Sequence, residues 1–133
     1  MGSKRKILVV DDDPDITLSL KMIFEKENYD VITVNNGLEC LEELKKGFSG
    51  TIILDIMMPV MDGIDVIKRM VVEGFIENNK IIVLTVKKIQ GEEFDDIYQY
   101  IQDYIQKPFD VNYLIKTVNK ISNENFSSQK KFL

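Results

Sequence analysis

The chain has 133 residues, a length that suits one domain with a core of its own. Its content of 44% hydrophobic and 29% charged residues is ordinary for a globular protein, and its net charge of −5 opposes direct binding to the phosphate backbone of nucleic acid. The chain contains no histidine, which excludes histidine metal ligands, histidine-based catalytic triads and phosphohistidine relays within it.

Five short apolar runs predict β-strands, at residues 6–10, 31–34, 51–54, 81–84 and, more weakly, 104–106. The first, third and fourth runs are continuously apolar, as central parallel strands covered by helices on both faces are. Polar residues interrupt the second and fifth runs, so we place these two strands at the edges of the sheet.

Segments with helical periodicity separate the runs and follow the last one. Side chains suited to N-capping precede the first, second, third and fifth segments, namely Asp13, Asn36, Asp62 and Asp110. The fourth helix is predicted from the apolar positions Phe94, Ile97, Tyr98 and Ile101. The pattern therefore predicts a doubly wound (βα)5 fold, in which helices cover both faces of a five-stranded parallel sheet as a three-layer α/β sandwich.

The ends of the chain are expected to lie outside this domain. Residues 1–4 are interpreted as an unstructured start or a cloning remnant, residues 5–121 as the domain, and residues 122–133 as a polar tail or truncated linker. The single cysteine, Cys40, cannot form an internal disulfide, and no apolar run is long enough for a signal peptide or a membrane span. We therefore expect a cytoplasmic protein that does not contact a membrane.

Polar side chains follow four of the predicted strands where ligands gather in open α/β sheets, beyond the carboxyl ends. Asp11, Asp12 and Asp13 follow the first strand, Asp55 the third, Thr85 the fourth and Lys107 the fifth. A cap role explains Asp13 on its own. Asp55 is harder to explain structurally, because it interrupts the apolar stretch TIILDIMM, where an unpaired carboxylate is costly.

Carboxylates delivered by two neighbouring strands suit a hard divalent cation. Mg²⁺ fits better than Ca²⁺, because it takes few carboxylates together with water and phosphate oxygens, and because DDDPDITLSLKM lacks the central Gly and final Glu of an EF-hand loop. A carboxylate beside Mg²⁺ can attack phosphorus, while a lysine and a hydroxyl stabilise the transferred group. Asp55 is the candidate nucleophile.

Four segments together resemble the response-regulator receiver domain of two-component signalling: ILVVDDDPDI, IILDIMMPVMDG, IIVLT and YIQKPF. They occur in the family's order and the resemblance covers residues from about 5 to 121. It implies a CheY-like, flavodoxin-like sheet of strand order 2-1-3-4-5.

The resemblance also implies roles for the acidic residues. Asp55 corresponds to the phosphoryl acceptor of the family. Asp12 and Asp55 are expected to bind Mg²⁺ directly, Asp11 partly through water, and Met57 through its backbone carbonyl.

The remaining roles concern the phosphoryl group and the response to it. Lys107 is expected to pair with the phosphoryl group, after a cis bond to Pro108, and Thr85 to donate a hydrogen bond to it. Tyr104 resembles the switch aromatic that moves inward when Thr85 is recruited. Val86 stands where the family usually has a small residue, which predicts restricted access to the site and slow turnover of the phosphoryl group.

The function implied is a phosphoaccepting switch in a phosphorelay. It is not an enzyme acting on other molecules, although it catalyses its own phosphorylation and dephosphorylation. The expected donor is a sensor histidine kinase or a phosphotransfer protein. Its output would act through an effector protein or domain outside this chain, or through a homodimer, using the face formed by the last two helices and the strand between them.

Two alternatives remain open at this stage. A pseudo-receiver would keep the fold as a protein-interaction module without being phosphorylated, and would show no effect of Mg²⁺ on melting. A flavin-binding electron carrier of the same topology needs a neutral phosphate loop after the first strand, where Asp11, Asp12 and Asp13 would repel the phosphate.

Overall fold

The computed structural model describes residues 4–86, 88 and 91–124. Its strands are β1 (Lys6–Val10), β2 (Asp30–Val34), β3 (Gly50–Leu54), β4 (Asn79–Thr85) and β5 (Asp103–Gln106). They pair in parallel in the order β2-β1-β3-β4-β5. The predicted strands and strand order are confirmed, including the edge positions of β2 and β5.

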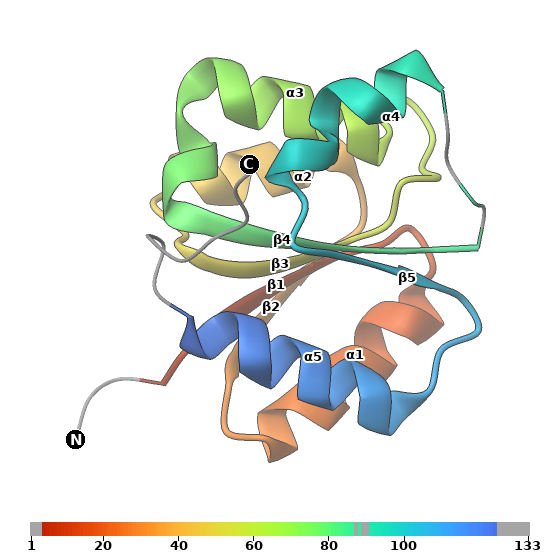
Figure 1. The fold of residues 1–133 in the computed structure, drawn as a ribbon. Helices are drawn as coiled ribbons and strands as arrows, with labels where there is room; N and C mark the ends of the chain where they lie inside the picture. Colours follow the sequence, from red (N-terminus) through yellow and green to blue (C-terminus); the bar gives the residue numbers. More distant parts are fainter. Residues whose placement is uncertain (1–3, 87, 89–90, 125–133) are drawn as a thin grey trace.

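The helices are α1 (Pro14–Lys26), α2 (Gly37–Lys45), α3 (Gly63–Glu73), α4 (Glu92–Ile97) and α5 (Val111–Asn123). Figure 1 shows α2, α3 and α4 on one face of the sheet and α1 and α5 on the other. This is the predicted three-layer sandwich. Among the described residues, no helix has both the length and the apolar character needed to cross a bilayer.

The predicted caps are present at the starts of four helices. The side chains of Asp13, Asn36, Asp62 and Asp110 each accept a hydrogen bond from a backbone amide in the first turn of the helix that follows. Asp62 and Asp65 form a reciprocal capping box. Such caps each stabilise a helix by about 1 kcal/mol, and three of them stand close behind the ends of strands that carry candidate site residues.

The fourth helix is shorter than the sequence predicts. It ends at Ile97 and passes into a 3-10 turn, Tyr98–Tyr100, so that Ile101 is extended with φ −101° and ψ 126° rather than helical. The amide of Gln102 already donates to the carbonyl of Ile81 in β4, at 2.8 Å, so the chain must have left the helix by that point. Ile97 and Ile101 are both buried, and their spacing of four residues is also that of a helical stripe, which is why the sequence predicts a longer helix.

Two further differences lie at element ends. A 3-10 turn that the sequence did not predict, Phe75–Asn78, links α3 to β4. At the C-terminal end, α5 continues through Asn123, so that Ser122 and Asn123 are helical. The remaining parts of the predicted start and tail, 1–3 and 125–133, lie outside the described residues.

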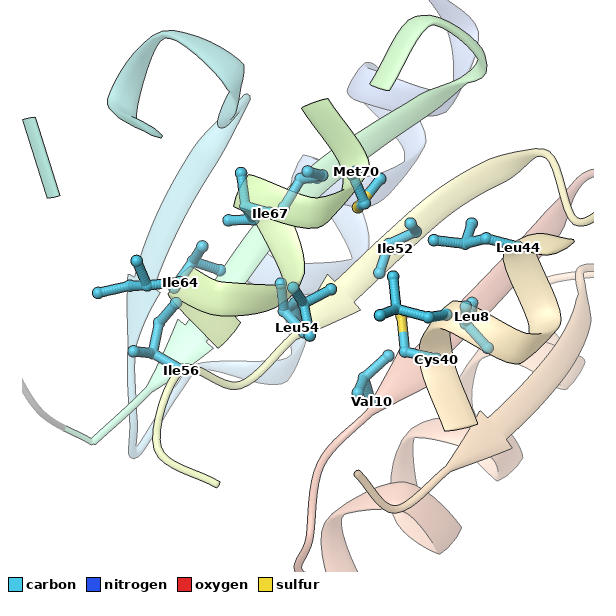
Figure 2. Packing of buried hydrophobic residues seen from close by; sticks show 14 of the residues in the cluster. Leu8, Val10, Cys40, Leu44, Ile52, Leu54, Ile56, Ile64, Ile67 and Met70 are labelled. Atoms are coloured by element: carbon cyan, nitrogen blue, oxygen red, sulfur yellow. The ribbon is translucent and has the colours of Figure 1, made fainter. Parts of the chain in front are cut away.

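Alternate residues of the central strands pack on opposite faces of the sheet. Leu8, Val10, Ile52 and Leu54 lie in the cluster with α2 and α3, which Figure 2 shows from close by. Ile7, Val9 and Ile53 lie in the second cluster, with α1 and α5. A slip of one residue would exchange the side chains that face α2 and α3 with those that face α1 and α5, and so would disrupt the packing of both clusters. The two clusters thereby fix the register, and with it the positions of the residues beyond each strand end.

Candidate functional site

The backbone places the site residues side by side by extending the strand ladders one step further. The amide of Asp11 donates to the carbonyl of Val34 at 3.3 Å, and the amide of Asp55 donates to that of Val10 at 2.9 Å. The amide of Lys107 donates to the carbonyl of Thr85 at 2.8 Å. Each residue thus stands at the carboxyl edge of the sheet, in the same order as the strands, as the sequence predicts.

Three carboxylates meet at this edge. Asp11, Asp12 and Asp55 each offer a carboxylate oxygen, and these oxygens lie within 4.8 Å of one another. Asp11 and Asp55 are only 2% and 5% exposed, whereas Asp12 is exposed to solvent. At an effective dielectric constant of 20, two charges at that separation repel by roughly 3 kcal/mol. The cluster is therefore costly without positive charge inside it.

Lys107 supplies one such charge. Its Nζ lies 2.7 Å from Oδ2 of Asp11, to which it donates a hydrogen bond, and 3.6 Å from Oδ2 of Asp55. The Lys107–Pro108 peptide bond is cis, as the resemblance implies. One lysine thus bridges two of the three carboxylates, which leaves room in the charge balance for a divalent cation.

The ionisation of the site reflects this crowding. Burial raises the pKa of Asp55, and the negative charge of Asp11 raises it further. The Met57 amide, the charge of Lys107 and the Thr85 hydroxyl lower this pKa and offset part of the rise. Burial alone would lower the pKa of Lys107, but the hydrogen bond and charge of Asp11, together with Asp55, raise it overall. Lys107 is therefore held in its charged form.

Thr85 brings a hydroxyl to the same place. Its side chain is fully buried, and although Oγ1 lies near enough to Asp55 to influence that carboxylate, it makes no hydrogen bond with any residue that the structure describes. A buried hydroxyl left unpaired costs about 1–3 kcal/mol. An acceptor oxygen beside Asp55 would remove this cost, so the site fits an oxyanion as well as a metal ion.

The third residue of the acidic run has a structural task. Asp13 caps α1, and its own amide donates to Oδ1 of Asp11 at 2.9 Å. This bond engages one oxygen of the Asp11 carboxylate, while Asp13 itself lies outside the acidic cluster. Asp13 thus takes the capping role that the sequence predicts, and Asp11, Asp12 and Asp55 form the acidic cluster.

The other residues singled out from the sequence lie around the site. The Met57 amide donates to Oδ1 of Asp55 at 3.0 Å. Val86, next to Thr85, is 58% exposed, and its carbonyl accepts a hydrogen bond from the side chain of Gln106 at 3.3 Å. Tyr104 is half-buried and packs edge-on against Phe94 of α4, with ring centroids 5.8 Å apart. The roles assigned to these residues remain predictions.

Two contacts near the site were missed from the sequence. A Cβ added to Gly63 would approach the Asp55 carbonyl oxygen to 2.6 Å, so only glycine allows α3 to start this close to the chain that follows β3. The signal was the Gly that follows the cap Asp62 at the start of α3. The ring contact between Phe94 and Tyr104 had no local signal, because it joins residues from different elements.

Comparisons with known proteins agree with this arrangement. Residues 7–119 match the family model described as the response regulator receiver domain. Among curated proteins, the chain is 34% identical over 125 residues to the transcriptional regulatory protein CpxR homolog of Haemophilus influenzae, covering 92% of this chain and 52% of the relative. The chain thus spans about half the length of that relative.

Two solved structures extend the likeness to three dimensions. A CheY-like receiver domain protein from Methanospirillum hungatei superposes with a TM-score of 0.82 at 35% identity, covering 88% of this chain and 93% of the other. The response regulator TrrA from Thermotoga maritima, in complex with Mg²⁺ and BeF, gives a TM-score of 0.74 at 31% identity, covering 88% and 98%.

Proposed function

Because the chain belongs to the response-regulator receiver family, we propose that it is a phosphoaccepting switch whose Asp55 receives a phosphoryl group from a partner histidine kinase or phosphotransfer protein. The observation that carries this proposal is the cluster of Asp11, Asp12 and Asp55 with Lys107 bridging it and the unpaired Thr85 hydroxyl beside it. Family membership alone would not require that this particular chain keeps a working site.

Asp11, Asp12, Asp55 and the backbone carbonyl of Met57 would hold Mg²⁺. When bound, the ion would offset the repulsion among the carboxylates and neutralise charge on the incoming phosphoryl oxygens. The TrrA structure, which contains Mg²⁺ together with BeF, supports this choice of ion.

The chain's own residues would perform the transfer. A carboxylate oxygen of Asp55 attacks phosphorus in line with the departing nitrogen of the donor, forming a P–O bond as the P–N bond breaks. The ammonium of Lys107 pairs with a phosphoryl oxygen, and the Thr85 hydroxyl donates a hydrogen bond to another. Hydrolysis of the acyl phosphate by water restores Asp55. The protein thus promotes its own phosphorylation and dephosphorylation and is a signalling switch rather than an enzyme with external products.

The phosphoryl group adds charge and three acceptor oxygens at the edge of the sheet. Recruitment of Thr85 toward it would leave space into which Tyr104 moves, which would alter the face formed by α4, β5 and α5. The output would pass to an effector protein or domain outside this chain, or would act through a homodimer that uses this face. These events belong in the cytoplasm, where the donor kinase domain acts.

The proposal is tested by incubating the protein with phosphoramidate or acetyl phosphate, with and without Mg²⁺. Intact-protein mass spectrometry is expected to show one added phosphoryl group with Mg²⁺ and little or none in excess EDTA. The unphosphorylated pseudo-receiver predicts no added mass in either condition. Absence of modification with both donors would therefore favour that alternative.

Val86 is expected to slow the loss of the phosphoryl group, because it directly follows Thr85, its side chain is 58% exposed, and it is larger than the residue usual at this place in the family. If this obstruction raises the barrier for water by about 1 kcal/mol, Val86→Ala should speed dephosphorylation about five-fold. The decay of the phosphorylated mass after removal of donor measures this rate. Val72→Ala, at an exposed position on α3, is the matched control; equal decay rates in the two variants would contradict the role of Val86.

A further inference from the structure

The opposite edge of the sheet carries a second concentration of charge, of the other sign. A hollow of about 430 Å³ lies where β1, β3 and β4 begin and α5 ends. Lys4, Arg5, Lys6 and Lys80 line it. In Figure 1 this edge is at the left, near the starts of β1 and β4 and the end of α5, whereas the acidic site lies at the right, beyond the carboxyl ends of the strands. The two sites are therefore separated by the length of the sheet.

Most of the positive charge in the hollow is not matched by carboxylates. Lys4, Arg5 and Lys6 are exposed, and within the described part of the chain none of them forms an ion pair. Glu124 is the only acidic residue of the lining. Four cations against one anion is a marked reversal in a chain whose net charge is −5.

Two of the cations also donate hydrogen bonds to neutral oxygens. Nζ of Lys80, a residue only 4% exposed, donates to the carbonyls of Ile121 and Glu124. Nη1 of Arg5 donates to the carbonyl of Ser122, at 2.8 Å, and to the side chain of Asn123. These bonds hold the last turn of α5 and satisfy carbonyls that a helix end leaves unpaired. The two partners of Arg5 are neutral oxygens, so they do not cancel its charge.

Donors remain available in the hollow after these contacts. The other guanidinium nitrogens of Arg5 make no hydrogen bond to the residues in the described ranges. Burial lowers the pKa of Lys80, while Glu124 acts in the opposite direction and Arg5 adds to the lowering. Arg5 shares the lining with the exposed Lys4 and Lys6, so its remaining nitrogens are available to pair with an anion there.

We propose that this hollow is a binding site for a small multivalent anion of the polyphosphate class. Several negative charges are needed, because the carboxylate of Glu124 and the carbonyl end of α5 oppose a single one. A guanidinium pairs well with the fork of oxygens on a phosphate, and the lysines on either side act as point charges. Long polyanions such as nucleic acid are disfavoured, because the net charge of the rest of the chain is negative.

The test is a titration of the full chain with inorganic tripolyphosphate, in chloride buffer freed of divalent metal by a chelating resin so that the acidic site plays no part. Amide NMR shifts of Gly50 and Ser122, which line the hollow, are expected to change in a saturable way. The double variant Lys4→Gln/Lys6→Gln should bind about ten-fold more weakly, since each exposed charge contributes up to about 1 kcal/mol. Both substituted residues are exposed, so the fold should be kept.

The matched control is Lys26→Gln/Lys116→Gln, which removes two exposed charges from outside the hollow and should bind as the unmodified chain does. Three results would overturn the proposal: no saturable shift at Gly50 or Ser122, the same shifts with chloride at equal ionic strength, or equal weakening in both double variants. Citrate binding as tightly as tripolyphosphate would overturn the phosphate class. None of these results bears on Asp55, whose phosphorylation is measured separately.

Discussion

Replacing Asp55 with asparagine is expected to abolish phosphorylation by small donors, the largest functional effect predicted for this chain. The amide is a poor nucleophile toward phosphorus and cannot form the acyl phosphate. Asparagine has nearly the same shape, and its oxygen can still accept the hydrogen bond that the Met57 amide donates to Asp55 Oδ1. Intact-protein mass spectrometry with phosphoramidate and Mg²⁺ should show no added mass.

The control for this variant is Asp15→Asn, which removes an exposed carboxylate near the start of α1 that is not part of the acidic cluster. It should be phosphorylated to the same extent as the unmodified protein. If Asp55→Asn still gained one phosphoryl group, peptide mapping would place the acceptor elsewhere, and the assignment of Asp55 would be wrong.

Replacing Lys107 with methionine is expected to have the largest effect on stability. Methionine keeps much of the length of the side chain but removes the charge that lies 2.7 Å from Asp11 and 3.6 Å from Asp55. The two buried carboxylates then face each other without compensation. Breaking a buried ion pair in this way costs about 3 kcal/mol, which for a domain of this size lowers the melting temperature by roughly 10 °C.

Mg²⁺ should restore much of this loss, because it would supply positive charge among the same carboxylates. In thermal melts without phosphate, the rise in melting temperature on adding Mg²⁺ is expected to be larger for Lys107→Met than for the unmodified protein. Lys116→Met, an exposed substitution on α5, should melt and respond to Mg²⁺ as the unmodified protein does. If Mg²⁺ raised the melting temperature of Lys107→Met and of the unmodified protein by the same amount, Lys107 and the ion would not compensate the same carboxylates.

Much of the fold and site was predictable because the relevant signals are local or follow from strand order. Continuous apolar runs identified β1, β3 and β4, and side chains such as Asp13 and Asp62 marked helix starts. Since parallel strands end at one edge, the residues after them had to meet there. That argument brought Asp55 and Lys107 together although 52 positions separate them in the sequence.

The features that were missed depend on contacts between distant elements. Ile101 continues the apolar spacing of a helix, but pairing of the next residue with β4 requires an extended chain. In the basic hollow, Lys80 at the start of β4 and Arg5 before β1 both donate hydrogen bonds to carbonyls at the end of α5. No window of sequence contains both partners of such contacts, and only the assembled sheet places them together.

The single backbone hydrogen bonds that continue the ladder to Asp11, Asp55 and Lys107 have a mechanical consequence. They tie the backbone of the charged residues to the hydrogen-bonded sheet, so we expect a bulky group on Asp55 to displace a neighbouring segment rather than the sheet. The movement would then occur in a helix that has little stability of its own. α4 has only six residues, of which Ile97 alone is buried, and so short a helix has little stability of its own. We expect the displacement to be concentrated there, far in sequence from the residue that is modified.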